Sequence, residues 1–170
     1  IVDHFIKMGQ KDIGMLAGDL NDEDDKEDLI DFRFQDFEFY ARKLGLFDSS
    51  KIFVGKFTSE SGYEVIKQAI EADKKIPDGL IVANDAMAIG ALKALREANI
   101  LIPNDVSVIS FNDTTAAKFA NPALSSVHVD THVMGTMGKQ VLQQVITNEK
   151  VTPYKVVFKT SLVLRESSLN

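Results

Sequence analysis

The stretch DGLIVANDAMAIGALKALREANILIPNDVSVISF, residues 78–111, holds two short apolar runs with a longer segment between them. The runs lie at residues 78–83 and 105–111, and both have the continuous apolar character that is typical of strands buried on two faces. The segment between them, residues 86–98, has the length of an ordinary helix. We therefore predict a strand–helix–strand unit, from which parallel sheets are built.

The same alternation continues toward the start of the chain. Residues 12–18 and 51–57 are two further apolar runs with the character of strands, and residues 29–44 between them predict a long amphipathic helix. Ser59 or Ser61 is placed to cap the next helix. The inner stripe of the first of these helices is Ile30, Phe34, Phe37, Ala41 and Leu44, and the second carries Val65, Ile66, Ala69 and Ile70. Because strand and helix alternate four times through short connections, we predict an α/β fold with a doubly wound, mainly parallel sheet.

The two ends of the chain depart from this rhythm. Residues 1–8 have the apolar spacing of a helix that stops at Gly9, and they include neither an initiating Met nor a signal peptide, so we expect the chain to start within a longer protein. Near the other end, an amphipathic helix is predicted over residues 132–148 and an alternating closing strand over residues 154–164. We expect residues 128–153 to leave the main sheet.

Composition restricts the classes of function. The chain has 170 residues, 45% apolar and 26% charged, and no apolar stretch approaches the roughly 20 residues that cross a bilayer, so one globular domain without membrane contact is expected. The net charge of −6 argues against binding of nucleic acid by this segment alone, because phosphate contacts need clustered Lys and Arg. The absence of Cys excludes disulfides and thiolate metal sites and fits a reducing compartment.

Motifs for catalysis or cofactor binding are missing from the sequence. The spacing of Gly14 and Gly18 matches neither a dinucleotide fingerprint nor a phosphate loop, and the acidic residues 22–28 lack the Gly that a calcium loop needs, which favours a solvated loop. The three His residues have no metal spacing, and no Ser lies in a nucleophile elbow. A phospho-accepting receiver domain has similar topology, but the residues after the first and third strands match its acidic positions poorly. We expect no catalytic residue, no metal and no cofactor.

Polar and aromatic side chains follow the strands at the edge where open parallel sheets bind their ligands. Phe57 comes after the second strand, Asn84 after the third, and Asn112 with Asp113 after the fourth. Carboxamides and carboxylates suit a polyhydroxylated ligand, and an aromatic ring suits the apolar face of a sugar. Arg33, near a helix start, adds a forked donor. The simpler alternative is that each Asn-Asp pair only ends a strand and caps the following helix.

Several segments resemble the lactose-repressor/galactose-repressor family of bacterial transcription regulators. HFIKMGQKDIGMLAG, residues 4–18, is similar to the helix, Gly and strand with which that family enters its second effector subdomain. VANDAMAIGALKALREANILIPNDVSVISFNDT, residues 82–114, is the most specific match, and NPALSSVHVDTHVMG, residues 121–135, resembles the crossover and the helix after it. Arg33 with Gly45 twelve residues on resembles the family's effector helix.

The resemblance implies a periplasmic-binding-protein-like fold of type I. A complete member has an N-terminal headpiece that binds operator DNA, a hinge and two α/β subdomains, and a small effector between the subdomains changes operator affinity through the dimer. This chain would then be the second subdomain over 1–127, a crossover and helix over 128–153 that return to the first subdomain, and a closing strand over 154–170. A cytoplasmic homodimer with part of helix 86–98 in its interface is expected. The alternative is that the apolar residues of this helix all serve the core.

By position, the resemblance makes Arg33 the effector-clamping arginine, Asn84 an effector-binding asparagine and Phe57 the ring that packs on a sugar. Asn112 falls where many sugar-binding members have Asp, so Asp113 beside it is the second candidate for that contact. The chain also departs from the family pattern in two further places, Asp36 for a helix Gly and Val129 for a polar contact.

The sequence FND at 111–113 resembles galactose-type regulators, so a sugar-responsive repressor is the expected function. Asp85, next to the effector-binding Asn84, is expected to serve helix capping. A periplasmic or lipoprotein sugar-binding protein of a transport system would share the cleft without the headpiece, and upstream sequence distinguishes the two. An enzyme of doubly wound fold is disfavoured, because no nucleophile, metal set or phosphate loop is present.

Overall fold

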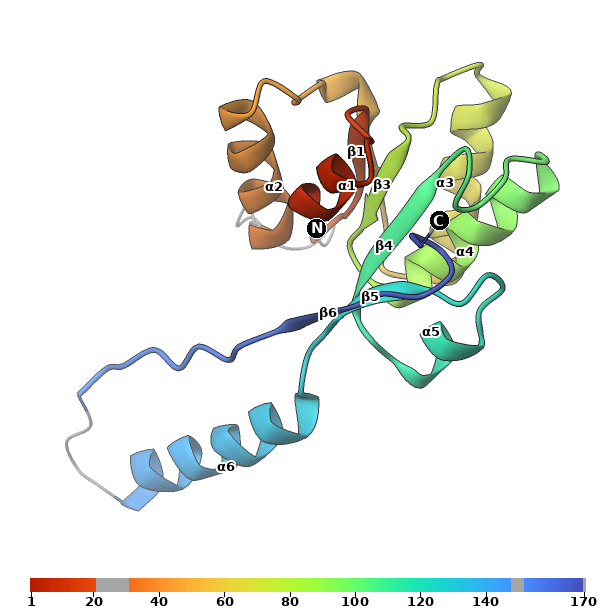
Figure 1. Ribbon diagram of the computed structural model, residues 1–170. Helices are drawn as coiled ribbons and strands as arrows, with labels where there is room; N and C mark the ends of the chain where they lie inside the picture. Colours follow the sequence, from red (N-terminus) through yellow and green to blue (C-terminus); the bar gives the residue numbers. More distant parts are fainter. Residues whose placement is uncertain (21–30, 148–151, 170) are drawn as a thin grey trace.

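The computed structural model describes residues 1–20, 31–147 and 152–169 (Figure 1). The acidic stretch 22–28 and the start of the helix expected from residue 29, including Ile30, lie outside the described residues.

Within these described residues, six strands form one sheet in the order β2-β1-β3-β4-β5-β6. The first five in sequence pair in parallel and β6 pairs antiparallel to β5, which confirms the predicted doubly wound, mainly parallel fold. The strands are β1 Ile13–Gly18, β2 Ile52–Gly55, β3 Gly79–Val82, β4 Ser107–Asn112, β5 Ser125–His128 and β6 Ser161–Val163.

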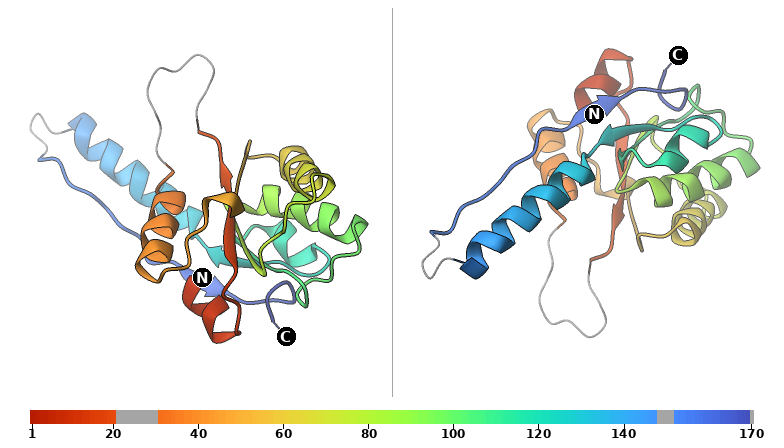
Figure 2. Two further views of the ribbon diagram at one scale, coloured as in Figure 1. Left: turned by 90° about the horizontal axis from the view of Figure 1, so that it is seen from above. Right: turned by 90° about the horizontal axis from the view of Figure 1, so that it is seen from below.

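Helices cover both faces of this sheet, with α1 and α2 on one side and α3 and α4 on the other (Figure 2). The helices are α1 Val2–Lys7, α2 Phe32–Lys43, α3 Ser59–Glu71, α4 Asp85–Glu97, α5 Thr115–Phe119 and α6 Thr131–Thr147, and one 3-10 turn, η1 Ser49–Lys51, precedes β2. The core between these layers is apolar, and its largest fully buried side chains include Phe5, Leu80, Met87, Leu95 and Ile109. Most of the apolar face of α4 therefore packs into the core of the chain, and Ile89 remains only partly buried.

Two glycines let α3 and α4 approach at backbone distance. A Cβ added at Gly62 would lie 2.2 Å from the carbonyl oxygen of Met87, and one at Gly90 would lie 1.9 Å from that of Ser59. Since neither position leaves room for a side chain, the two helices are fixed side by side. This contact brings the N-termini of α3 and α4 together at the carboxyl edge of the sheet.

Several local expectations are corrected. The cap of α3 is Thr58, whose hydroxyl accepts from the Ser61 amide, rather than Ser59 or Ser61. Leu44 is 41% exposed because the helix has already ended at that residue, so it does not belong to the inner stripe. The closing strand spans only β6, since the described residues before it pair with no strand. β5 was not expected as a strand.

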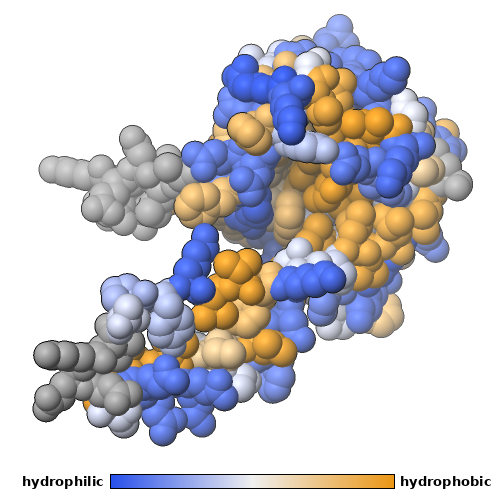
Figure 3. Space-filling model, turned by 60° about the vertical axis from the view of Figure 1, so that its left-hand side comes forward, coloured by the Kyte–Doolittle hydropathy of each residue, from blue (hydrophilic) through white to orange (hydrophobic). Residues whose placement is uncertain are grey.

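The helix predicted over 132–148 is α6, and it projects away from the sheet together with the extended segment before β6 (Figure 1). None of its described residues is buried, and Leu142, Val145 and Ile146 are each more than half exposed. We call α6 and the extended segment before β6 the arm. Hydrophobic side chains are visible on this arm as well as on the main body (Figure 3). Within the described residues, no helix is both long and apolar enough to cross a membrane.

Candidate functional site

The carboxyl ends of β2, β3 and β4 meet the N-termini of α2, α3 and α4 at one edge of the sheet. The five residues predicted for the site all lie at these strand and helix ends. Two groups form there. Arg33, Phe57 and Asn84 contact one another or one another's neighbours, whereas Asn112 ends β4 and Asp113 begins the turn that follows it.

Arg33 is the centre of the first group. Its guanidinium donates to both carboxylate oxygens of Asp31, with Nε at 2.8 Å and Nη2 at 3.0 Å, and its Nη1 donates to the carbonyl oxygen of Ala83 at 2.6 Å. The ring centroids of Phe57 and Phe111 lie 5.1 Å and 6.0 Å from its central carbon. The guanidinium is thus held near two aromatic rings, a geometry in which cation–π attraction adds to its hydrogen bonds.

Asp31, which holds this arginine, also caps the helix. Its Oδ1 accepts from the Arg33 amide at 3.0 Å, which makes it the N-cap of α2. The Asp31 side chain is 8% exposed and that of Arg33 is 31% exposed. The arginine therefore keeps contact with solvent, while the buried Asp31 carboxylate sets its orientation. Within the described residues, three of the five N–H groups of the guanidinium have partners.

Asn84 is the N-cap of α4. Its Oδ1 accepts from the Met87 amide at 2.8 Å, and its Nδ2 donates to the carbonyl oxygen of Phe57 at 3.4 Å. The expectation that Asp85 serves the capping is therefore wrong, because only Asn84 has the extended backbone of a cap residue. Both residue types are good caps, so the side chains alone do not show which one caps the helix. These two bonds fix the Asn84 side chain, and with it the direction of the second N–H of its amide.

Phe57 lies over the end of β1. A Cβ added at Gly18 would lie 1.9 Å from the tip of the Phe57 ring, so glycine is needed there for the ring to take its position. The ring is half-buried, between the strand backbone on one side and the Arg33 guanidinium on the other.

The turn after β4 has an unusual backbone. Asn112 has φ +104° and Asp113 has φ +53°, both in the region that side chains other than glycine rarely adopt. The Asp113 carboxylate, 7% exposed, accepts from Arg165 Nη2 at 2.6 Å and lies 3.1 Å from Nδ1 of His128. Both of its oxygens are therefore engaged inside the chain, whereas Asn112 is half-buried at the strand end.

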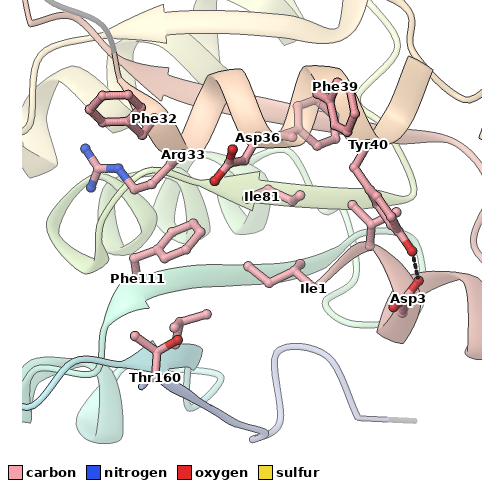
Figure 4. A pocket seen from close by; sticks show the side chains of 13 residues that line it. Ile1, Asp3, Phe32, Arg33, Asp36, Phe39, Tyr40, Ile81, Phe111 and Thr160 are labelled. Carbon is pink, nitrogen blue, oxygen red and sulfur yellow. Dashed lines mark hydrogen bonds between the residues drawn. The ribbon is translucent and has the colours of Figure 1, made fainter. Parts of the chain in front are cut away.

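A groove of about 560 Å³ runs along α2 from this edge. Arg33 and Asp36 extend into it from the helix, and Phe111, Ile81 and Thr160 line the opposite wall (Figure 4). Phe57, Asn84, Asn112 and Asp113 are not among its lining residues. Within the part of the chain that the structure describes, no three His, Asp or Glu side chains are grouped to hold a metal ion.

Two residues that contact Arg33 were not predicted from the sequence. Asp31 orients Arg33, and its only sequence signal is an Asp two residues before the arginine at a helix start. Phe111 supplies a second ring beside the guanidinium, and its signal is its place at the end of β4.

Residues 2–168 match the family described as periplasmic binding protein-like domain. The chain belongs to this family. Within the periplasmic-binding-protein-like family, the HTH-type transcriptional regulator GalR of Lacticaseibacillus casei is 45% identical over 170 residues, which cover 99% of this chain and 51% of that protein. The predicted resemblance to the lactose-repressor/galactose-repressor family is thereby confirmed.

Two solved structures are similar to this chain over nearly its whole length. The transcriptional regulator CelR in complex with cellobiose matches with a TM-score of 0.84 and 29% identity over 96% of this chain and 48% of that one. The Lac repressor dimer bound to operator and the anti-inducer ONPF matches with a TM-score of 0.85 and 25% identity over 99% of this chain and 49% of that one. The chain spans about half the length of the curated relatives it matches.

Proposed function

We propose that this chain is the effector-binding and dimerisation region of a bacterial sugar-responsive transcription regulator, a repressor of galactose type. The observation that carries the proposal is the guanidinium of Arg33, oriented by Asp31 and held near the rings of Phe57 and Phe111 at the carboxyl edge of the sheet. A forked donor between aromatic surfaces suits a ligand with hydroxyl groups on its rim and an apolar C–H face.

In the proposed complex each predicted residue has a distinct task. Arg33 donates to sugar oxygens, Phe57 packs on the ring, and the second N–H of the Asn84 amide donates to a hydroxyl. Of the pair after β4, Asn112 is the favoured contact, because the oxygens of Asp113 are already engaged by Arg165 and His128. No bond of the sugar is broken, so the chain acts as a receptor and not as an enzyme.

The exposed arm supports the proposed division of the chain. We assign residues 1–127 to the second subdomain, 128–153 to a crossover and helix that pack on a first subdomain, and 154–170 to a strand that returns. Val145 and Ile146 on α6 and Val157 on the returning segment are apolar and exposed, as expected of surfaces that another subdomain covers.

The sugar would act by favouring one relative orientation of the two subdomains, which the paired headpieces read as a change in operator affinity. Such coupling is limited by the preference of the sugar for one state, typically about 1–3 kcal/mol. The protein would work as a homodimer in the cytoplasm, where its operator lies, with the exposed part of α4 near the interface. A transport function has no comparable support, because the named relatives are transcription regulators.

DNA binding by the full-length protein tests the proposal. Operator sequences are first selected from a random DNA library, and their affinity is then measured by fluorescence anisotropy with and without galactose. We expect galactose to change the affinity of the wild type by about 5- to 150-fold. Arg33→Ala should bind DNA like the wild type but lose the response to galactose.

Arg42→Ala is the matched control, because Arg42 lies on the same helix, exposed, and pairs with Glu38 outside the site. It should respond to galactose like the wild type. An undiminished response of Arg33→Ala would contradict the proposed site, and the lack of any response of the wild type across a panel of sugars would contradict the proposed function.

A further inference from the structure

Asp85 holds a buried carboxylate that neither capping nor direct ligand contact explains. The residue is 1% exposed, and its two side-chain oxygens accept three hydrogen bonds. The hydroxyl of Ser110 and that of Ser126, the latter at 2.7 Å, donate to Oδ1, and the amide of Thr114 donates to Oδ2 at 2.6 Å. These partners come from β4, from β5 and from the turn that follows β4.

The carboxylate is tolerated in the interior for two reasons. Each of the three partners donates to one of its oxygens, so the buried side chain is not left with an unsatisfied acceptor. Asp85 is also the first residue of α4, where the helix N-terminus favours a negative charge. Because Asn84 already caps the helix, α4 itself does not require a carboxylate at this position.

What the carboxylate does hold is the turn over residues 112–114. Asp85 binds the Thr114 amide directly, and it also orients the hydroxyl of Ser126, which accepts from the Asp113 amide at 3.0 Å. Two successive amides of the turn are thus tied to one carboxylate. Asn112 and Asp113 have positive φ angles, and such a backbone persists only where its surroundings fix it.

We propose that Asp85 is a positioning residue of the effector site, which holds the turn over 112–114 and so directs the Asn112 amide toward the bound sugar. This inference rests on the proposed function, in which Asn112 is a sugar contact. Asp85 itself does not touch the sugar.

A double-mutant cycle on the full-length protein separates positioning from a merely structural role. Galactose affinity is measured by calorimetry for the wild type, Asp85→Asn, Asn112→Ala and the double variant. The carboxamide that Asp85→Asn introduces would bring a donor among three donors, so we expect galactose affinity to fall about tenfold or more. If Asp85 acts through Asn112, the double variant binds no more weakly than the weaker single variant. Losses that add, or wild-type affinity in Asp85→Asn, would overturn the inference.

Amide hydrogen exchange provides a readout that needs no sugar. Asp85→Asn should speed exchange at Asp113 and Thr114 selectively, because their acceptors are the carboxylate and the hydroxyl that it orients. Ser107→Ala is the control, since Ser107 is a buried serine at the opposite end of β4 that bonds to Gln10 and Pro103.

The control should leave exchange in the turn and galactose affinity unchanged. Unchanged exchange in Asp85→Asn would overturn the positioning role, even if galactose binds. If exchange rises as expected but the wild type binds no sugar, the turn is held by Asp85 and the proposed function is what fails.

Discussion

The two ends of the sheet use carboxylates in different ways. At the amino end, Asp12 pairs with Lys51 and with Lys75, the latter at 2.6 Å, so opposite charges neutralise one another near the surface. At the carboxyl end, Asp85 is buried among hydroxyls and a backbone amide, and Asp113 is bound by Arg165. At the amino end the carboxylate only pairs with opposite charges, whereas at the carboxyl end the carboxylates, one of them also paired, hold a strained turn and orient side chains.

The pKa directions fit this contrast. Partial burial works to raise the pKa of Asp12, but the hydrogen bonds from Lys51 and Lys75 outweigh it and lower the pKa. The hydrogen bond with Asp12 in turn raises the pKa of both lysines. We therefore expect changes at the amino end to alter stability alone and changes at the carboxyl end to alter ligand binding. Three predictions test this.

Among these three, the largest effect is expected at Gly18. In Gly18→Ala of the full-length protein, the new methyl group would collide with the Phe57 ring and displace it from Arg33. We expect galactose affinity to fall about tenfold, the scale of a lost aromatic contact, when measured by calorimetry. Phe57→Ala should weaken binding to a similar degree. If Gly18→Ala binds galactose normally, the position of this ring is not part of the site.

An intermediate effect is expected at Asn84, where capping and binding can be separated. Asn84→Ser keeps a capping oxygen but lacks the amide donor, so the melting temperature should stay near that of the wild type while galactose affinity falls several-fold. Asn84→Ala removes the cap as well and should cost a further ~1 kcal/mol of stability. Differential scanning calorimetry and sugar titration of both variants provide the comparison. Full galactose affinity in Asn84→Ser would limit Asn84 to capping.

The smallest effect is expected at Asp12, and it depends on pH. Its pKa in the folded protein lies below the ordinary value of 3.8, so the carboxylate stabilises the fold above about pH 4, and this contribution is lost as pH falls through the folded pKa. Asp12→Asn should therefore lower the melting temperature at pH 7 by no more than about 4 °C, and the difference should shrink in acid. Galactose affinity should not change. A loss of affinity would break the division between the two ends.

Most of the order of elements, and the edge of the sheet at which the candidate residues meet, were predictable, because both follow from apolar runs and from the residues that end them. The capping role was assigned to Asp85 although Asn84 performs it, since either side chain can cap a helix and only the folded backbone shows which one does. β5 was missed because Ser125 and Ser126 break the apolar pattern, although their hydroxyls are satisfied by partners from other segments. Contacts of this kind join residues that are far apart in sequence, and no local pattern reports them.

We propose that a sugar binds at the carboxyl edge of the sheet through Arg33. Calorimetric titration of the full-length protein with galactose, in the wild type and in Arg33→Ala, tests it most directly. We expect saturable binding of one sugar per chain in the wild type and affinity reduced by about tenfold to a hundredfold or more in the variant, because charge-assisted hydrogen bonds are lost. Equal galactose affinity in the two proteins would contradict it.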